Sequence, residues 1–589
     1  MPPEPREYKD DVLPRKPSSQ KSAKSFPSSG PKAPTFSDRL YLAGVLHRPI
    51  DAAFLLGGLG SCVWTAVCML VLDIPFLIWT RFSVNSERHP ISWGPIFSFC
   101  MAMSRASSSA VYNVVQLRMV SNIISWFIPL RMLHLSNYKF DPNVRFKVHL
   151  DTLLIPERKT LFYTRRELGH NGGHRGKNPS NPSPEYLASF LPDEDKTGRI
   201  PNLPEESGPL DMDGTYTMKG EWIEALEDPT HLPNDDKEAK RSNVVVLYAH
   251  GGGHVFCSAK FHRQLVTRML LEFGPGARAF VMEYRLAPED PFPAAIHDAY
   301  AAYLYLTQPN HEAITLCRGG LRGAHHTTPV DPKDIVLAGD SAGAGVAIGL
   351  QLYLRDYVQP SVEPKPIVPP ATVLISAWTD ISTSMPSATS RHSYCYTPSP
   401  MGVNPFASQE KFYSFPKFNF ARTYLCGDSD LFPNERNSGG KDLEWEWYRH
   451  LAQHPLVSPV YTANLSGLES STLLQTGTFD RLVDDTRLYA HKLGQANPDE
   501  RVRLELYRDM VHVHQFFEFL PMADKALKSM VAFVEDAQQR HKTRVSAKTR
   551  GSNGTEWIIV DTVGNETEGH NDDGCPIDVL ETYWRPDLK

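Results

Sequence analysis

A five-residue motif of the form Gly-x-Ser-x-Gly constrains the fold of this chain more than any other feature; it consists of Gly339, Asp340, Ser341, Ala342 and Gly343. The run before it, residues 335–338, is short and apolar, as a buried strand would be, and residues 344–354 contain little that would break a helix. A strand that reverses so tightly into a helix forces Ser341 into a strained backbone conformation, which only flanking glycines allow without a clash. The motif therefore predicts a serine whose hydroxyl is held clear of its neighbours.

A second glycine-rich motif, His-Gly-Gly-Gly, lies upstream and is formed by His250, Gly251, Gly252 and Gly253. It follows directly on residues 244–249, an apolar and β-branched run that predicts a central strand. Consecutive glycines let bare backbone N–H groups approach an oxyanion closely. The Gly-x-Ser-x-Gly pattern alone arises easily by chance in a chain with 38 glycines. Two such motifs in this order, each placed after a strand, indicate acyl transfer through a serine.

A general base and an orienting acid are expected further along the chain, each after the end of a strand. Residues 471–477 read as a strand that leaves into a loop, and Asp480 follows just past its end. Residues 502–507 alternate apolar and charged side chains, as a strand near a sheet edge would, and His512 follows closely. The sequence thus predicts Ser341 as nucleophile, His512 as general base and then acid, and Asp480 as the carboxylate that holds the imidazole tautomer.

Each of these assignments has a competitor nearby in the sequence. Asp484 and Asp485 are close to Asp480, but carboxylates also suit the N-terminal end of the helix that is expected there. His514 is an alternative base, although it lies two residues deeper, at the start of a Phe-rich helical segment. Four further side chains with nucleophilic or basic groups are interpreted as surface or core residues; they are His254, His262, His491 and Cys257.

With these motifs in place, the chain resembles the hormone-sensitive-lipase-like branch of the α/β-hydrolase family. The run Tyr-Arg-Leu-Ala-Pro-Glu at 284–289 is specific to this branch, and the resemblance covers roughly residues 244–535. The other matching positions are 250–253, 291–295, 339–343, 376–380, 455–459 and 510–512, with Asp480, Leu482 and Asp484. The resemblance implies an α/β fold in which helices flank a mostly parallel central sheet.

The same resemblance implies roles for the glycine-rich loop. The backbone N–H groups of Gly252, Gly253 and Ala342 would form the oxyanion hole, Gly251 would shape the turn, and His250 would organise the loop rather than act as the base. The implied enzyme is a serine hydrolase that cleaves carboxylic esters without a metal or organic cofactor. Membrane-anchored, fungal-type relatives include steryl acetyl hydrolases, which implies a short acyl group such as acetyl on a sterol, an acylglycerol or another lipophilic alcohol.

The N-terminal region predicts attachment to a membrane. Residues 1–48 are rich in Pro, Ser and Lys and are expected to be disordered. Residues 52–72 carry no charge, and about 20 such residues span the core of a bilayer. We therefore predict a single-pass transmembrane anchor within residues 49–82; the competing interpretation is a buried core helix. Residues 83–144 hold shorter, interrupted apolar segments, which are expected to lie against the membrane or to form cap helices.

Two features bear on the orientation of this anchor. Arginines flank it on both sides, and only the basic character of the whole N-terminal tail favours a cytosolic N-terminus. Three Asn-x-Ser/Thr sequons, at Asn464, Asn553 and Asn565, are compatible with a lumenal catalytic domain. The endoplasmic reticulum is the expected membrane, in part because of the resemblance to steryl acetyl hydrolases.

The rest of the chain is expected to form one catalytic domain, residues 145–540, with its first strands at 145–157 and 214–225. Residues 169–208 are rich in Gly, Asn, Pro and Ser and predict a mobile insertion. The final segment, residues 541–589, is polar and acidic apart from a short apolar stretch, and is predicted to be a tail.

Two further stretches are longer than the resemblance requires. Residues 309–332 lack apolar periodicity and are expected to form a surface loop. Residues 384–453 are rich in aromatic side chains. This second insertion is either a cap subdomain that buries its own rings or a wall of the acyl or alcohol pocket.

Composition excludes several classes of function. The formal net charge is −6, near neutral for 589 residues, and no basic stripe that would indicate nucleic-acid binding is visible. The eight cysteines are scattered and show neither metal-ligand spacing nor a disulfide framework. The resemblance implies a lipophilic ester substrate, and the predicted anchor implies the membrane bilayer as a partner.

Two other functions are compatible with the same motifs. Amide hydrolases such as formamidases share the serine turn and the glycine loop, and nothing local separates amide from ester cleavage. A non-catalytic small-molecule receptor on the same fold is the second alternative. Receptors of this kind tend to lose the catalytic histidine, whereas His512 is present here.

Overall fold

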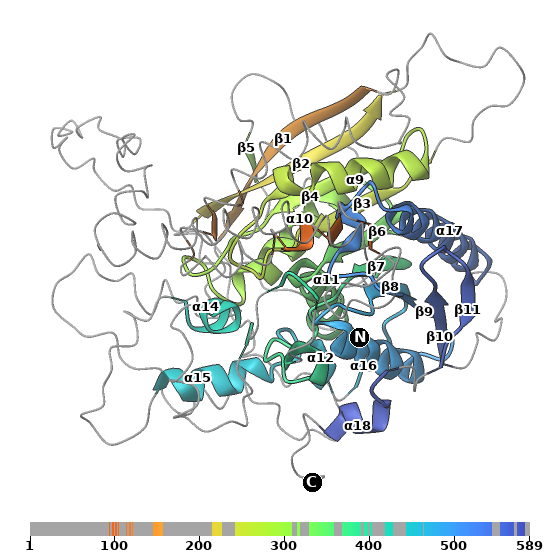
Figure 1. Ribbon diagram of the computed structural model, residues 1–589. Coiled ribbons are helices and arrows are strands. Elements are labelled where there is room, and N and C mark those ends of the chain that lie inside the picture. The colour runs from red at the N-terminus through yellow and green to blue at the C-terminus, as the bar shows by residue number, and fades with distance from the viewer. Residues whose placement is uncertain are drawn as a thin grey trace, which may run out of the picture. The chain divides into compact units, whose positions relative to one another are not determined.

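A mixed β-sheet organises the part of the chain that the computed structural model describes (Figure 1). Its strands in chain order are β1 (Arg145–Pro156), β2 (Thr215–Leu226), β3 (Val245–Ala249), β4 (Arg278–Glu283), β5 (Thr315–Cys317), β6 (Ile335–Asp340), β7 (Ala371–Ile375), β8 (Ser471–Gly477), β9 (Val502–Tyr507), β10 (Thr555–Val560) and β11 (Glu566–Glu568). In space they run β11-β10-β9-β8-β7-β6-β3-β4-β2-β1-β5. Neighbours from β10 through β4 in this order are parallel, and the strands beyond them at both ends pair antiparallel.

The described residues all belong to the unit Ala53–Lys589. They are 93–94, 97–98, 100–102, 104, 114, 117–118, 121, 145–156, 215–226, 242–308, 315–317, 329–358, 368–389, 394–397, 401–402, 419–427, 443–462, 464–544, 554–570 and 574–582. The predicted disordered tail, 1–48, the predicted anchor, 49–82, and the predicted mobile insertion, 169–208, lie outside them. Within the described part, no helix is both long and apolar enough to span a membrane.

Helices cover both faces of the sheet. They are α9 (Ala259–Phe273), α10 (Ala294–Thr307), α11 (Ala342–Tyr353), α12 (Pro386–Thr389), α14 (Phe420–Cys426), α15 (Leu443–Ala452), α16 (Val483–Ala496), α17 (Pro521–Arg544) and α18 (Ile577–Thr582). Figure 1 shows α9 and α17 together on one side, and their apolar side chains form one core with the sheet. Side chains from α10, α11 and α16 pack in the core on the opposite face.

Alternation along the central strands supplies both cores. On β6, Ile335 and Leu337 point into the core under α10 and α11, whereas Val336 and Ala338 point into the core under α9 and α17. Because both faces of a parallel sheet are covered, such strands read as continuous apolar runs. The fold is thus a mixed sheet flanked by helices, in agreement with the α/β class expected from the sequence.

The order of the strands places the two glycine motifs together. From β3 the chain continues to β4 on one side, and then crosses to β6 on the other side of β3. Ligand sites in open α/β sheets lie at such a switch point, beyond the carboxyl ends of the strands. The strands β6, β7, β8 and β9 are then neighbours in sequence order, so the loops that follow them meet along the same edge.

The C-terminal region differs from the predicted polar tail. Helix α17 continues to Arg544, and residues 554–582 add β10, β11 and α18 to the domain. Strand β10 pairs in parallel with β9 over six residues. Of the described strands, only β10 and β11 lie beyond β9 at this end of the sheet, in agreement with the position near the sheet edge that the alternating charges of β9 predict. In the expected surface loop 309–332, β5 pairs with β1. In both cases a short strand is stabilised by a partner that is distant in sequence, which local periodicity does not reveal.

The described positions within 83–144 pack on the catalytic domain. Trp93, Phe97 and Met101 form a buried cluster with Cys395 and Val511. This contact fits the cap interpretation of the segment.

Candidate active site

Ser341 lies at the tight turn between β6 and α11 and is 8 % exposed. Its backbone angles are φ 54° and ψ −120°, outside the regions that non-glycine residues usually occupy. A Cβ on Gly343 would lie 2.1 Å from the Ala249 carbonyl oxygen, and one on Gly339 would lie 2.6 Å from the backbone of Gly343. The two glycines are therefore required by the close packing of this turn against the end of β3.

The glycine loop after β3 lies against the serine turn. The N–H group of Gly251 donates to Asp340 Oδ1 at 2.9 Å, which fixes the loop to the turn. Because this N–H group is already bonded, the next two glycines are better placed to present donors to an oxyanion. Gly252 and Gly253 have φ values of 113° and 57°, a conformation that favours glycine.

Asp340 is a buried carboxylate that joins the two loops. It accepts a hydrogen bond from the Tyr248 hydroxyl at 2.8 Å and lies 3.1 Å from His262 Nε2. Burial raises its pKa, but the charge of His262 and the hydrogen bonds outweigh burial and hold the pKa of Asp340 below its usual value. Asp340 is therefore ionised at neutral pH and remains an acceptor for the Gly251 N–H group.

His250 organises the glycine loop through its ring. Its Nδ1 donates to the Gly251 carbonyl oxygen at 2.7 Å, and its ring stacks on Tyr284 at a centroid distance of 4.4 Å. The Tyr284 hydroxyl in turn donates to the His250 carbonyl oxygen at 2.7 Å. Complete burial, together with the charge of His262, lowers the pKa of His250 to about 3. The ring is therefore neutral and held in place, as expected for a loop organiser.

Asp480 and His512 lie side by side, although they follow different strands. His512 Nδ1 is 3.0 Å from Asp480 Oδ1 and 3.1 Å from Oδ2, and both side chains are buried. Because a carboxylate only accepts hydrogen bonds, Nδ1 carries the ring proton and Nε2 is left as the basic nitrogen. This is the tautomer that a general base needs.

Further donors hold the Asp480 carboxylate. The Leu482 N–H group donates to Oδ1 at 3.0 Å and the Thr476 hydroxyl to Oδ2 at 3.2 Å. The Ser376 hydroxyl also favours the ionised form of this side chain and lowers its pKa. Burial raises the pKa of Asp480, but the charge of His512 and the hydrogen bonds outweigh it and hold the pKa below its usual value. The carboxylate is therefore ionised beside His512.

Hydrogen bonds connect the serine turn to the loops of the acid and the base. The N–H group of Ser341 donates to the carbonyl oxygen of Ile375, the last residue of β7, at 2.9 Å. The next residue, Ser376, donates its N–H group to Gln475 on β8 at 2.7 Å. The Val513 N–H group then donates to Ser376 Oγ at 2.9 Å. The three predicted catalytic residues thus follow strands that are joined at the same edge of the sheet.

The competing carboxylates, Asp484 and Asp485, have other partners. Asp484 Oδ1 lies 3.3 Å from the guanidinium of Arg487, one turn along α16. Asp485 Oδ2 lies 3.4 Å from the backbone nitrogen of Asp380, and burial raises the pKa of Asp485 well above its usual value. The carboxylate that contacts the ring of His512 is Asp480.

His514, the alternative base, is completely buried. Its ring lies 4.6 Å from the ring of Tyr507, and neither ring nitrogen has a hydrogen-bond partner among the described residues. Burial lowers the pKa of His514 to about 3. A ring that stays neutral and has no contact with a carboxylate is poorly suited to accept the serine proton.

Replacing His514 with leucine is expected to leave esterase activity unchanged and to make the fold less sensitive to acid. In the native chain the unfolded state binds a proton below about pH 6.5, whereas folded His514 resists protonation down to about pH 3. The stability that the neutral, buried ring contributes to the fold is present above pH 6.5 and is lost as the pH falls below that value. Urea unfolding gives the free energy of unfolding at pH 7.5 and at pH 5.0. Between these pH values it should fall by about 2 kcal/mol less in the variant than in the native chain. An equal loss in both proteins would contradict the assignment.

The remaining candidates occupy structural positions. His254 stacks on Tyr424 at 3.8 Å, and burial lowers its pKa to about 3. Burial raises the pKa of the Cys257 thiol, which makes it a poor nucleophile. His262 is the partner of Asp340 described above. None of the three is arranged as a catalytic group.

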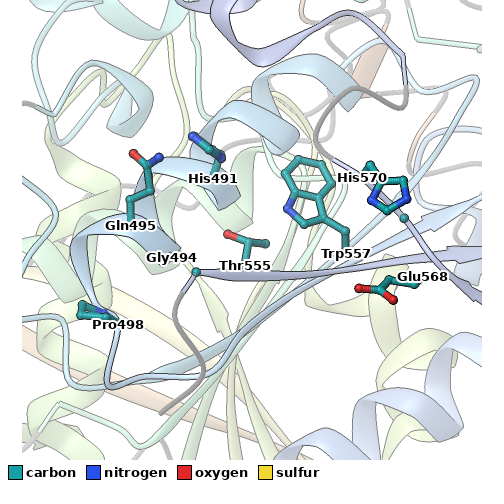
Figure 2. A pocket seen from close by; sticks show the side chains of 10 residues that line it. His491, Gly494, Gln495, Pro498, Thr555, Trp557, Glu568 and His570 are labelled. Atoms are coloured by element: carbon teal, nitrogen blue, oxygen red, sulfur yellow. The ribbon is translucent and has the colours of Figure 1, made fainter. Parts of the chain in front are cut away.

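His491 lies away from the serine turn, in a separate hollow of about 560 Å³ (Figure 2). The hollow lies between the C-terminal half of α16 and the strands β10 and β11. Figure 2 shows the residues that line it; they are His491, Gly494, Gln495, Pro498, Gly554, Thr555, Trp557, Glu568, Gly569 and His570. None of the predicted catalytic residues lines this hollow.

Parts of the aromatic-rich insertion, 384–453, line the catalytic loops. A Cβ on Gly253 would lie 2.4 Å from the ring of Phe420. The Tyr396 hydroxyl donates to the carbonyl oxygen of His512 at 3.0 Å, and its ring lies 6.1 Å from the imidazole. Of the two interpretations of the insertion, these contacts support a wall beside the active site.

Two residues contact the loop of His512 without having a role predicted from the sequence. Tyr396 is one of many aromatic residues in its insertion, and nothing in its spacing distinguishes it. Ser376 carries a weak signal, because it is the first polar residue after a strand that lies next to the strand of the serine turn. Among the described residues, no group of three or more His, Cys, Asp or Glu side chains could hold a metal ion.

Comparison with known proteins shows that the chain is similar to esterases. Residues 246–403 and 434–516 match a family described by its α/β-hydrolase fold. The chain is 30 % identical over 303 residues to an acetyl-hydrolase of Streptomyces hygroscopicus, which covers 51 % of this chain and 78 % of that protein. It is 26 % identical over 317 residues to an esterase of Acinetobacter venetianus, with 54 % and 78 % covered.

Two further similarities are to a cholesterol ester hydrolase and to a solved esterase structure. The neutral cholesterol ester hydrolase 1 of Bos taurus is 34 % identical over 133 residues, which is 22 % of this chain and 28 % of that protein. Among solved structures, an esterase from the bacterial hormone-sensitive lipase family is 28 % identical, with a TM-score of 0.37 over 55 % of this chain and 82 % of that one.

Proposed function

Because the chain belongs to the hormone-sensitive-lipase branch of the α/β-hydrolase family and is a carboxylic ester hydrolase, we propose that Ser341, His512 and Asp480 carry out its reaction. Ser341 attacks the ester carbonyl carbon while His512 Nε2 takes the hydroxyl proton. The tetrahedral intermediate collapses, and His512 gives that proton to the departing alcohol. Water then attacks the acyl-enzyme with His512 again as the base, which releases the acid and restores Ser341.

The oxyanion of the intermediate is proposed to bind at the glycine loop. Its donors are the N–H groups of Gly252, Gly253 and Ala342, and Asp340 fixes this loop through Gly251. Donors of this kind are worth about 3 kcal/mol each in transition-state stabilisation. They act without reorganisation because the positions are set before substrate binds.

One observation carries the proposal. The imidazole of His512 lies 3.0 Å from the Asp480 carboxylate, at the sheet edge where the Ser341 turn also ends. A buried acid–base pair that follows strands of the same sheet edge as a strained serine supports acyl transfer. The same pair argues against a receptor function, because a receptor pocket needs neither the base nor its acid.

The substrate is proposed to be a short-chain ester of a lipophilic alcohol, such as a steryl acetate. Two similarities support it: one relative is named an acetyl-hydrolase, and another a neutral cholesterol ester hydrolase. The predicted anchor at 49–82 would hold the domain at a membrane. We propose that this membrane is the endoplasmic reticulum and that the catalytic domain lies on its lumenal side. A membrane-held domain would meet a lipophilic ester laterally.

The full-length protein in detergent micelles is expected to hydrolyse p-nitrophenyl acetate and micellar cholesteryl acetate. It is expected to leave the matched amide, p-nitroacetanilide, intact. Colorimetric rates and thin-layer analysis of released sterol measure the two activities. Cleavage of the amide without the esters would favour the amide-hydrolase alternative, and hydrolysis of p-nitrophenyl acetate alone would remove the sterol part of the proposal.

A further inference from the structure

Ser376 occupies a central position in the proposed active site. It directly follows β7, which lies between the strand of Ser341 and the strand that precedes Asp480. The residue is completely buried, and its backbone φ of 48° is unusual for a residue other than glycine. Its N–H group donates to the carbonyl oxygen of Gln475 at 2.7 Å. The backbone bond to β8 thus fixes where its hydroxyl lies.

The hydroxyl of Ser376 bridges the loops of the acid and the base. Its oxygen accepts the N–H group of Val513, the residue after His512, at 2.9 Å. The same hydroxyl also stabilises the ionised form of the Asp480 carboxylate and so lowers its pKa. One side chain thus bonds to the residue after His512 and favours the charged form of the carboxylate that pairs with His512.

The bond to Val513 holds a strained backbone. Val513 has φ 45° and ψ 50°, in the left-handed region. A β-branched residue pays roughly 1–3 kcal/mol there and stays only where the surroundings impose the conformation. Its side chain is buried in the core under α17, and its N–H group has the Ser376 oxygen as acceptor. The direction in which the chain enters Val513 decides where the preceding imidazole points.

We propose that Ser376 is a positioning residue of the triad, which holds the imidazole of His512 toward Ser341 by restraining the strained peptide at Val513. The inference rests on the proposed function, since it needs the same acid and base. Ser376 itself takes no proton from the substrate and forms no bond with it.

Replacing Ser376 with alanine is expected to lower kcat for p-nitrophenyl acetate by about 10- to 100-fold, because a displacement of about 1 Å of a catalytic group costs about that much. KM is expected to stay within about twofold, since the hydroxyl faces the acid–base pair. Steady-state kinetics on the full-length protein gives both constants. Thermal unfolding by circular dichroism shows how far the fold has been weakened.

A matched control separates positioning from general destabilisation. Ser458 is also completely buried, and its hydroxyl oxygen accepts the Ile381 N–H group at 3.0 Å, away from the acid and the base. Ser458→Ala should therefore lower the thermal midpoint to a similar extent while kcat is retained. If both variants lose kcat in proportion to stability, the positioning role is wrong.

A second measurement tests whether Ser376 acts through Val513. Glycine adopts the left-handed conformation without strain. In a Val513→Gly background, the further change Ser376→Ala should therefore cost at least about threefold less in kcat than it does in the native chain. Equal losses in both backgrounds would overturn the inference. If Ser376→Ala alone does not fold, the double variant is compared with Val513→Gly, and a loss of kcat as large as 100-fold would overturn it.

Failure of the inference is distinguishable from failure of the proposed function. If the unaltered protein hydrolyses no ester and Ser341 does not react with a fluorophosphonate, the triad itself is wrong. If the unaltered protein is active and the Ser376→Ala variant matches it in kcat, only the role of Ser376 is wrong.

Discussion

Replacing Ser341 or His512 with alanine is expected to lower kcat for p-nitrophenyl acetate by about 10⁶-fold, and Asp480→Asn by about 10⁴-fold. The first two changes remove the attacking oxygen and the base. An asparagine amide would donate to His512 Nδ1, and the ring would then carry its proton on Nε2 and could not accept one from Ser341. Initial rates on folded protein measure all three losses.

Asp484→Asn is the matched control for this series, because Asp484 pairs with Arg487 in the same helix and not with the base. Its kcat is expected to stay close to that of the native chain. Labelling by a fluorophosphonate should disappear in Ser341→Ala and persist in Asp484→Asn. Retained hydrolysis in Ser341→Ala or His512→Ala would remove that residue from the mechanism.

The candidate site could be predicted from the sequence largely because its determinants are local. The glycines beside Ser341 are demanded by a turn whose backbone packs within van der Waals distance of the end of β3. Asp480 and His512 each follow a strand that reads as a short apolar or alternating run. Once successive strands are assumed to be neighbours, the loops after them are expected at one edge. The pairing of His512 with Asp480 then follows from order along the chain.

The contacts that position these residues could not be predicted in the same way. The bond from Val513 to Ser376 joins residues 137 positions apart, and the bond from Tyr396 to His512 joins residues 116 positions apart. Serine and tyrosine are common in loops, and their roles depend on backbone directions that local patterns do not specify. The sequence indicates the candidate catalytic groups, whereas the contacts that orient them are found only in the structure.

The C-terminal strands β10 and β11 could not be predicted from the sequence for a different physical reason. Charges on β9 predict a strand near the sheet edge, and in the structure these charges have partners. Glu505 is buried and accepts from the Tyr507 hydroxyl at 2.7 Å, and Arg503 lies 3.1 Å from Glu566 on β11. Alternation therefore reports which side chains are charged, not whether a later segment will neutralise them. A four-residue apolar stretch in a polar tail was the only signal of β10.

Removing residues 545–589 is expected to prevent the catalytic domain from folding as a stable monomer. The deletion exposes the hydrogen-bonding edge of β9 and withdraws four side chains that are at most 9 % exposed; they are Trp557, Val560, Ile577 and Leu580. At roughly 1.5–3 kcal/mol for each buried side chain, the loss is about 6–12 kcal/mol. This is comparable with the whole stability of a typical domain. Soluble yield, thermal unfolding and ester hydrolysis of the deleted and full-length proteins measure the effect.

A pair of point variants tests the same claim without shortening the chain. Val560 ends β10 and is 1 % exposed, whereas Val563 lies in the following turn and is 77 % exposed. Val560→Asp buries an unpaired charge against the core of β9 and α17 and should lower the thermal midpoint by more than about 5 °C, which corresponds to the several kcal/mol that such burial costs. Val563→Asp leaves its charge in water and should not change it. Equal midpoints for the two variants, or a deleted protein as stable as the full chain, would mean that β10 contributes little to the stability of the domain.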